Sequence, residues 1–151
     1  EALNVLRIEK GFITHAEIDG RVTAFDLGME RMVNQTKDCI GKAASQRPGL
    51  NDVDRPQLVG IKPVVSVKQL TAGAHLFTLQ DPAERIYDQG HVTSVAYSPT
   101  FGCFYGLAFL KNGSERYGEQ IRMVDHVRDI EAICEVVPPI GFDPEGRRAR
   151  A

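Results

Sequence analysis

The residues that could perform chemistry are spread thinly along this chain. Four histidines, His15, His75, His91 and His126, stand far apart, without the short spacing typical of metal ligands. Cys103 could act as a nucleophile, but no histidine or acid adjoins it in the sequence, so an inert thiol is the simpler interpretation. The nucleophile-elbow, phosphate-loop, zinc-protease and dinucleotide-binding motifs are absent. The residues alone therefore predict neither a metal site nor an enzyme of these classes.

A charged pair near the start of the chain is a second candidate. Arg7 and Glu9 alternate with Leu6 and Ile8, which predicts an extended segment over 4–9 with both charges on one face. The two charges could pair with each other there. The acidic residues of this region are otherwise expected to be solvated; they are Glu9, Glu17, Asp19, Asp26 and Glu30.

The stretch Ser98-Pro99-Thr100-Phe101-Gly102 separates two apolar, strand-like runs. Pro99 fixes φ and removes a backbone donor, so a strand ladder must break there. Gly102 permits a positive φ before the next strand begins. Locally this pattern predicts a tight β connection, and any functional role depends on the residues around it.

Runs rich in Val, Ile, Phe, Tyr and Thr recur from Gln57 onward, with turn residues between them. The last two runs alternate polar and apolar residues, which predicts a hairpin around 126–129. Short strands at this spacing predict a mainly β fold, a small barrel or sandwich. The predicted strands are 58–63, 73–79, 90–97, 104–111, 119–125 and 130–137.

The residues before the first strand predict a partial α+β segment. Thr23 and Asp26 have the spacing of a capping box, which predicts a short helix over 24–33. Residues 38–44 predict one or two further helical turns. These pieces have no partner layer of their own. We therefore divide the chain into 1–44, the tail of a neighbouring domain, 45–56, a polar linker, and 57–151, a β-barrel domain.

Composition limits the function classes. A length of 151 residues suits one modest domain, or one domain plus part of another. A net charge of -2 predicts no broad basic surface for nucleic acid. No apolar run approaches the ~18 residues of a membrane span. Cys39, Cys103 and Cys134 are widely spaced, which favours reduced thiols in a cytoplasmic protein. Because the sequence starts at Glu1 rather than Met, we interpret it as a piece of a longer protein.

Separate blocks of the sequence resemble the glycine-cleavage T-protein family of folate aminomethyltransferases, in the family's order and spacing. This resemblance implies that 57–151 forms the six-stranded antiparallel, Greek-key-like barrel that closes the family's fold. The blocks are Leu6-Arg7-Ile8-Glu9-Lys10-Gly11, similar to L-R-[LI]-E-x-G; 19–28, similar to D-x-x-x-T-x-x-x-L-G; 37–42, similar to K-x-D-F-I-G-[RK]; and 90–94 with 98–102, similar to G-x-V-T-S…S-P-T-L-G.

One branch of this superfamily is more similar still. Residues 9–15, 46–50, 110–113 and 142–146 resemble the C-terminal part of the α subunits of heterotetrameric sarcosine oxidases. The resemblance implies a parent enzyme that oxidises sarcosine to glycine and passes the one-carbon unit to tetrahydrofolate, or releases formaldehyde without folate. FAD, FMN and NAD would belong to the parent complex and not to this segment. The implied partners are upstream domains of the same subunit and the other subunits.

The resemblance also implies site residues. In the family, the Arg of L-R-x-E lies near the folate, and a Tyr about eight residues later lines the same pocket; Arg7 and His15 match these positions. A guanidinium suits the carboxylate end or the ring edge of folate, and His15 could stack or donate a hydrogen bond. Glu9 is a further candidate. The acid that handles the folate nitrogen belongs to an earlier domain, so no catalytic residue is expected here. Second-tier candidates for a wall of the cavity are His91, Tyr97, Ser98 and Thr100.

Two alternatives remain open. The chain could be the C-terminal part of a T-protein itself or of a single-chain dimethylglycine or sarcosine dehydrogenase. It could also be a non-catalytic β-barrel interaction module, although modules of that kind lack the L-R-x-E and S-P-T-x-G blocks.

Overall fold

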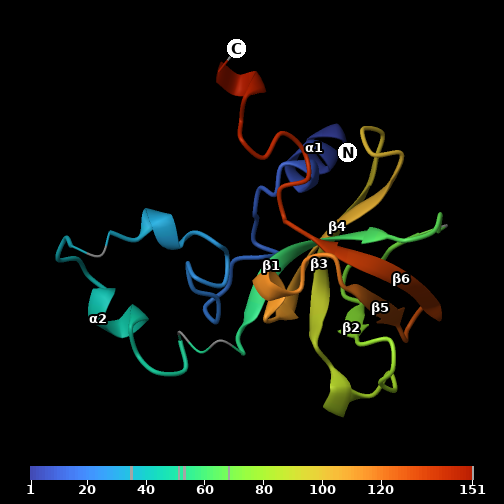
Figure 1. Ribbon diagram of the computed structural model, residues 1–151, viewed down its shortest axis with the longest axis horizontal. Helices are drawn as coiled ribbons and strands as arrows, with labels where there is room; N and C mark the ends of the chain where they lie inside the picture. Colours follow the sequence, from blue (N-terminus) through green and yellow to red (C-terminus); the bar gives the residue numbers. More distant parts are fainter. Residues whose placement is uncertain (35, 51, 53, 68, 151) are drawn as a thin grey trace.

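The computed structural model describes residues 1–34, 36–50, 52, 54–67 and 69–150. At its centre is a closed antiparallel barrel (Figure 1). All the predicted strands are confirmed, with bounds that differ from the predicted ones by no more than two residues. The strands are β1 Pro56–Pro63, β2 His75–Phe77, β3 Gly90–Ser98, β4 Cys103–Lys111, β5 Gln120–Asp125 and β6 Ile130–Val137.

The strand order around the barrel is β1-β4-β3-β2-β5-β6, and β1 pairs back to β6. Three consecutive strands, β2 to β4, lie side by side with β1 next to β4, which is the Greek-key arrangement. The predicted hairpin between β5 and β6 is confirmed, with Asp125 opposite Ile130. Each strand thus has a neighbour on both sides, although the short β2 pairs with β3 at only two positions, His75 with His91 and Leu76 with Gly90.

Strand β4 is buried on both faces. Its side chains alternate, so Ala108 and Leu110 face the interior while Leu107 and Phe109 face outward. Continuous burial over 105–110 shows that another element covers the outer face. The buried interior comprises Val59, Ile61, Leu70, Ala74, Leu76, Val92, Ala108, Leu110, Ile121, Met123, Ala132, Cys134 and Val136.

The covering element is the N-terminal segment, which begins with helix α1, Ala2–Glu9. This helix contacts β3 and β4, and Ile8 is fully buried against Leu58, Leu107 and Phe109. The barrel therefore supplies the partner layer that the segment lacks by itself.

The predicted extended conformation of 4–9 is wrong, because these residues are helical. Gly11, two residues after the last helical residue, has a φ of +69°. The Phe12 N–H donates to the Arg7 carbonyl (2.8 Å) and the Gly11 N–H donates to the Ile8 carbonyl (3.1 Å). These two bonds form a Schellman motif, in which a left-handed glycine closes the helix. Packing of Ile8 on the barrel stabilises a helix that is too short to be stable alone.

The prediction of a short helix over 24–33 is also wrong. This part of the chain forms turns that lead into a 3-10 helix, η1, Glu30–Met32. The capping-box contacts nevertheless form: the Thr23 N–H donates to the Asp26 carboxylate (2.7 Å) and the Asp26 N–H donates to Thr23 Oγ1 (3.3 Å). The Asp26 carbonyl accepts from the Leu58 N–H (2.7 Å), so the backbone is tied to β1 instead of continuing a helix.

The remaining helical pieces are short. Helix α2, Lys42–Ser45, is a single turn that overlaps the end of 38–44, where one or two turns were expected. Positions 51 and 53 of the predicted linker lie outside the described residues. None of the described helices has the length and apolar character needed to cross a bilayer. The other 3-10 turns are η2 Arg85–Tyr87, η3 Gly113–Glu115 and η4 Arg148–Arg150.

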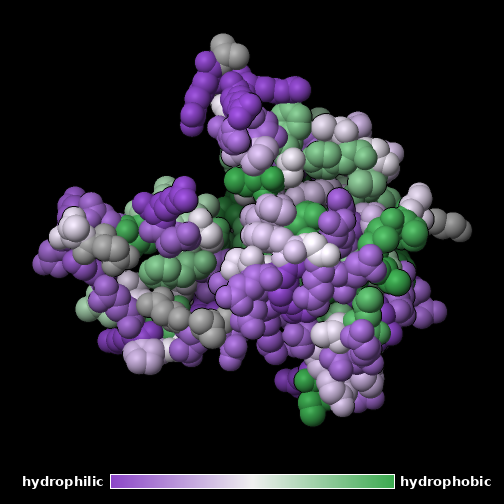
Figure 2. Space-filling model, in the orientation of Figure 1, coloured by the Kyte–Doolittle hydropathy of each residue, from purple (hydrophilic) through white to green (hydrophobic). Residues whose placement is uncertain are grey.

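Apolar side chains remain exposed on the N-terminal segment. Leu3, Leu6 and Phe12 are 79%, 61% and 62% exposed. In the space-filling view, apolar atoms gather at the end of the molecule where α1 and the β3–β4 turn lie, while the C-terminal turn η4 is strongly hydrophilic (Figures 1 and 2). This end of the molecule therefore differs from the hydrophilic surface that covers much of the same face (Figure 2).

Candidate functional site

Two buried carboxylates hold the N-terminal segment against the barrel. Glu9 is 3% exposed and Glu17 is 1% exposed, so the expectation that these acids are solvated is wrong. Each accepts hydrogen bonds from hydroxyl groups of β3 or of the turn that follows it. Buried charges persist where hydrogen bonds replace water, and these hydroxyls do so here.

The Glu9 cluster comprises Glu9, Ser98 and Thr100. The Ser98 hydroxyl donates to Glu9 Oε1 (2.5 Å) and the Thr100 hydroxyl donates to Oε2 (3.2 Å). The Phe101 N–H donates to Ser98 Oγ (3.0 Å), which orders the turn. Gly102 has the expected positive φ, +67°. The L-R-x-E block and the S-P-T-x-G block are thus in direct contact, and the turn's hydroxyls bind a side chain of this chain.

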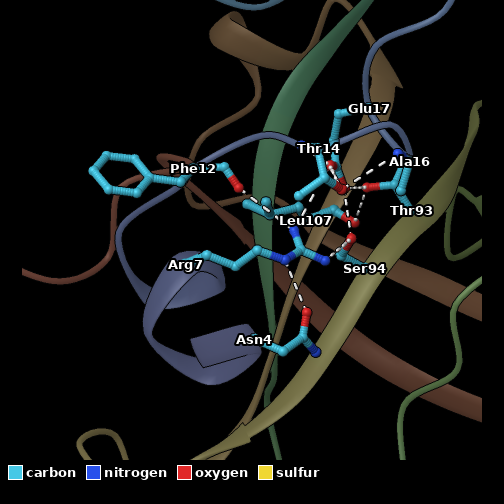
Figure 3. A network of polar contacts seen from close by, with 9 residues as sticks. All are labelled: Asn4, Arg7, Phe12, Thr14, Ala16, Glu17, Thr93, Ser94 and Leu107. Atoms are coloured by element: carbon cyan, nitrogen blue, oxygen red, sulfur yellow. Dashed lines mark hydrogen bonds and ion pairs between the residues drawn. The ribbon is translucent and has the colours of Figure 1, made fainter. Parts of the chain in front are cut away.

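The Glu17 cluster comprises Glu17, Thr14, Thr93, Ser94 and Arg7 (Figure 3). Glu17 accepts from the Thr14 N–H (2.8 Å), the Thr14 hydroxyl (3.1 Å), the Thr93 hydroxyl (2.7 Å) and the Ser94 hydroxyl (2.5 Å). The register of β3 shifts at Thr93, and this β-bulge allows Thr93 and Ser94 to bind the same carboxylate. Burial opposes ionisation of Glu17, but the hydrogen bonds from Ser94, Thr93 and Thr14 outweigh it and lower the pKa of this carboxyl.

Arg7 leaves α1 toward the Glu17 cluster, and each of its nitrogens has a partner (Figure 3). Nη2 donates to Ser94 Oγ (3.0 Å), Nε donates to Asn4 Oδ1 (2.8 Å) and Nη1 donates to the Phe12 carbonyl (3.4 Å). Nη1 also lies 3.7 Å from Glu17 Oε2. Within the described chain Arg7 therefore pairs with Glu17 and not with Glu9, because residues two apart on a helix do not face each other.

The structure does not bring all the predicted site residues together. Among the described residues, no hydrogen bond joins His15, His91 or Tyr97 to either cluster. His15 is exposed. The His91 ring packs against Phe109 (5.9 Å between centroids), and desolvation, helped by the nearby His75, lowers the pKa of its imidazole. Tyr97 is 53% exposed and meets Phe104 edge-on at 5.4 Å.

Sequence reasoning missed the two central residues of the Glu17 cluster. Ser94 is the last residue of the G-x-V-T-S block, so its place in that block was the available signal. Glu17 carried no local signal, because a single acid among other acids is typical of a solvated surface.

The chain also has a hollow of about 660 Å³ beside the β3–β4 turn. Phe101, Cys103, Tyr105 and Ile140 contribute to its wall, while Arg7 and His15 are not among its lining residues. Within the part of the chain that the structure describes, no three His, Cys, Asp or Glu side chains are grouped so that they could hold a metal ion. The buried Cys134 thiol has its pKa raised to about 12 by desolvation, so it is not a nucleophile.

Comparison with known families decides the identity of the barrel. Residues 57–143, more than half of the chain, match the family model of the glycine cleavage T-protein C-terminal barrel domain. The chain belongs to this family. A solved aminomethyltransferase T of the glycine cleavage system, from Bartonella henselae, has the same fold, with a TM-score of 0.74 and 21% identity over 95% of this chain and 38% of its own.

Sarcosine oxidase α subunits have a higher sequence identity to this chain than the solved aminomethyltransferase T has. The subunit from Rhizobium meliloti (strain 1021) is 41% identical over 149 residues, and that from Corynebacterium sp. (strain U-96) is 38% identical over 151 residues. Each match covers 98% of this chain but only 15% of the relative. The resemblance to this branch is thereby confirmed, and most of such a relative lies outside the matched region.

The buried acids predict a pH-dependent stability. Burial opposes ionisation of Glu17 and Asp26, but hydrogen bonds, from Ser94 to Glu17 and from Arg55 to Asp26, lower both pKa values below the ordinary 4.5 and 3.8. This stabilisation is fully present above those ordinary values and is lost as the pH falls through the lowered ones. We expect the thermal midpoint to decline gently below about pH 6.5, because the lowered pKa of His91 means that the unfolded chain binds a proton there first, and to fall more steeply below about pH 4.5.

Thermal unfolding of Glu17→Gln tests this pH dependence, with Glu131→Gln, from an exposed pair, as the control. Glu17→Gln should be less stable at pH 7 and should lose less further stability in acid. If the thermal midpoint falls equally steeply in acid for the wild type and for Glu17→Gln, the Glu17 carboxylate does not cause this pH dependence.

Proposed function

We propose that this chain is the folate-side, C-terminal portion of a sarcosine oxidase α subunit. The proposed parent enzyme oxidatively demethylates sarcosine to glycine and transfers the one-carbon unit to tetrahydrofolate. The observation that carries the proposal is the 41% identity to a sarcosine oxidase α subunit across 98% of the chain. The lower identity of 21% to the solved aminomethyltransferase T favours this branch over a T-protein.

The residues of this chain can form only part of a binding site for tetrahydrofolate. Arg7 is 18% exposed and is an obligate donor, so it can bind an acceptor of folate by sharing the N–H groups that now contact Phe12 and Ser94. His15, exposed on the same segment, is the second proposed contact. Glu9 would act indirectly, because its contacts with Ser98 and Thr100 fix the end of α1. We therefore expect the 151-residue chain alone to bind folate weakly or not at all.

The exposed apolar side chains of the N-terminal segment support the proposed partners. Leu3, Leu6 and Phe12 form the kind of apolar surface that domain interfaces cover. We assign this surface to upstream domains of the same subunit. Further contacts with the other sarcosine oxidase subunits are part of the same proposal.

Titration of tetrahydrofolate into the full-length protein tests the function. The wild type should bind, and Arg7→Ala should weaken binding by about 1–3 kcal/mol because a charged hydrogen bond is lost. Isothermal calorimetry measures both. Arg147→Ala, in an exposed pair near the C-terminus, is the matched control.

The outcomes are distinct. Absence of binding by the wild type would overturn the folate assignment. Binding with unchanged affinity in Arg7→Ala would leave the folate assignment standing and reduce Arg7 to a structural role.

A further inference from the structure

Glu17 both attaches the N-terminal segment to the barrel and contacts Arg7. Its side chain is completely buried, and its ion-pair partner is Arg7, the proposed folate contact. The segment is also held by the Glu9 cluster and by the ion pair between Asp26 and Arg55. Glu17 is thus one of several residues that attach the N-terminal segment to the barrel, and among them it is the one that contacts Arg7.

Ser94 connects the two charges in a fixed direction (Figure 3). A guanidinium can only donate hydrogen bonds and an ionised carboxylate can only accept them. The Ser94 hydroxyl has a single proton, which goes to Glu17 Oε1 at 2.5 Å, while its oxygen accepts from Arg7 Nη2 at 3.0 Å. The hydrogen bonds therefore run from Arg7 to Ser94 to Glu17, and the carboxylate determines which way the hydroxyl lone pairs face.

We propose that Glu17 is a positioning residue for Arg7: acting directly and through Ser94, its carboxylate holds the guanidinium in the orientation that receives folate. This rests on the proposed function of Arg7. Without the negative charge, Ser94 is free to turn its proton elsewhere, and Nη1 loses its counter-charge. Arg7 then retains the bonds from Nε to Asn4 and from Nη1 to the Phe12 carbonyl, while Nη2 loses the acceptor that fixes it.

A double-mutant cycle in the full-length protein tests the proposal against tetrahydrofolate. Glu17→Gln keeps the size of the side chain but removes its charge. Glu17→Gln and Arg7→Ala should each raise the Kd about tenfold, and the double variant should bind no more weakly than Arg7→Ala alone. Losses that multiply to about a hundredfold would overturn the proposal, because independent structural effects add as free energies. Glu135→Gln, which removes the carboxylate of an exposed pair with Lys62, should leave the Kd unchanged.

A second measurement does not depend on folate. Phenylglyoxal reacts with accessible guanidinium groups, and peptide mass spectrometry measures the rate at each arginine. In the full-length protein, Arg7 should react several-fold faster in Glu17→Gln and in Ser94→Ala than in the wild type. Arg55, whose buried pair with Asp26 joins the same segment to the start of β1, should keep its rate.

These results separate the two claims. An unchanged rate at Arg7, or an equal rise at Arg55, would overturn the positioning role, since the second result means that the whole segment has undocked. If the wild type binds no tetrahydrofolate, the proposed function fails, and the labelling rates alone decide whether Glu17 holds Arg7.

Discussion

Replacing Gly90 by alanine is expected to destabilise the barrel by about 3 kcal/mol or more. A Cβ atom at this position would lie 1.9 Å from the Phe109 carbonyl oxygen and 3.0 Å from the Leu110 Cα. Gly90 pairs with Leu110 on β4 and with Leu76 on β2, so backbone surrounds it on both sides. Strand backbones in a closed barrel have little freedom to separate. Urea unfolding, followed by circular dichroism, measures the loss.

Gly102→Ala provides the matched control. Gly102 has φ +67°, and a Cβ atom added there would meet no neighbouring side chain or backbone within 4 Å, so its replacement causes backbone strain without a clash. That strain costs about 1–2 kcal/mol. Gly90→Ala should therefore lower the free energy of unfolding more than Gly102→Ala does. If it does not, close approach of the β4 backbone does not explain why the G-x-V-T-S block begins with glycine.

The strands were predictable because their signals are local. The alternation in β5 and β6 and the turn residues between the runs indicate each strand within a few positions. The closure of the barrel and its Greek-key order came from the family resemblance, since pairing between β1 and β6 joins residues more than 70 positions apart. Strand β4 shows the limit of periodicity: it is buried on both faces, so its sequence does not alternate.

Helix α1 was not predictable from its own residues. Over 4–9 the sequence alternates as a strand would, and eight residues are too few to make a helix stable without tertiary contacts. What decides the conformation is the burial of Ile8 on β4 and the left-handed Gly11 that ends the helix. Gly11 was visible in the sequence, but a glycine ends a strand as readily as a helix.

The candidate site depends on contacts between residues that are far apart in the sequence. Glu9 meets Ser98 across 89 positions, and Glu17 meets Ser94 across 77. Family blocks indicated that Arg7, Glu9 and the S-P-T turn belong to one region, although not which of them touch. The partner of Arg7 is Glu17, an acid outside every block that the resemblance rested on.

Replacing Arg55 by alanine is expected to cost about 3–5 kcal/mol, because it leaves the Asp26 carboxylate buried without its counter-charge. Arg55 Nε and Nη2 bind the two carboxylate oxygens at 2.8 and 2.5 Å, and the Asp26 side chain is only 4% exposed. Nη2 also donates to the Arg21 carbonyl at 2.7 Å. Arg55 directly precedes β1, so this pair joins the N-terminal segment to the start of the barrel. Chemical unfolding at pH 7 measures the loss.

Arg21→Ala tests whether burial, and not ion-pair distance, causes the loss. Arg21 and Asp19 are 2.6 Å apart, nearly as close as the buried pair, but their side chains are 88% and 43% exposed. An ion pair that is exposed to solvent contributes little to stability, so Arg21→Ala should be nearly neutral. Adding Asp26→Ala to Arg55→Ala should restore part of the stability, because the unpaired charge is then gone. Equal losses in Arg21→Ala and Arg55→Ala, or no recovery in the double variant, would show that the buried pair does not join the segment to the barrel in this way.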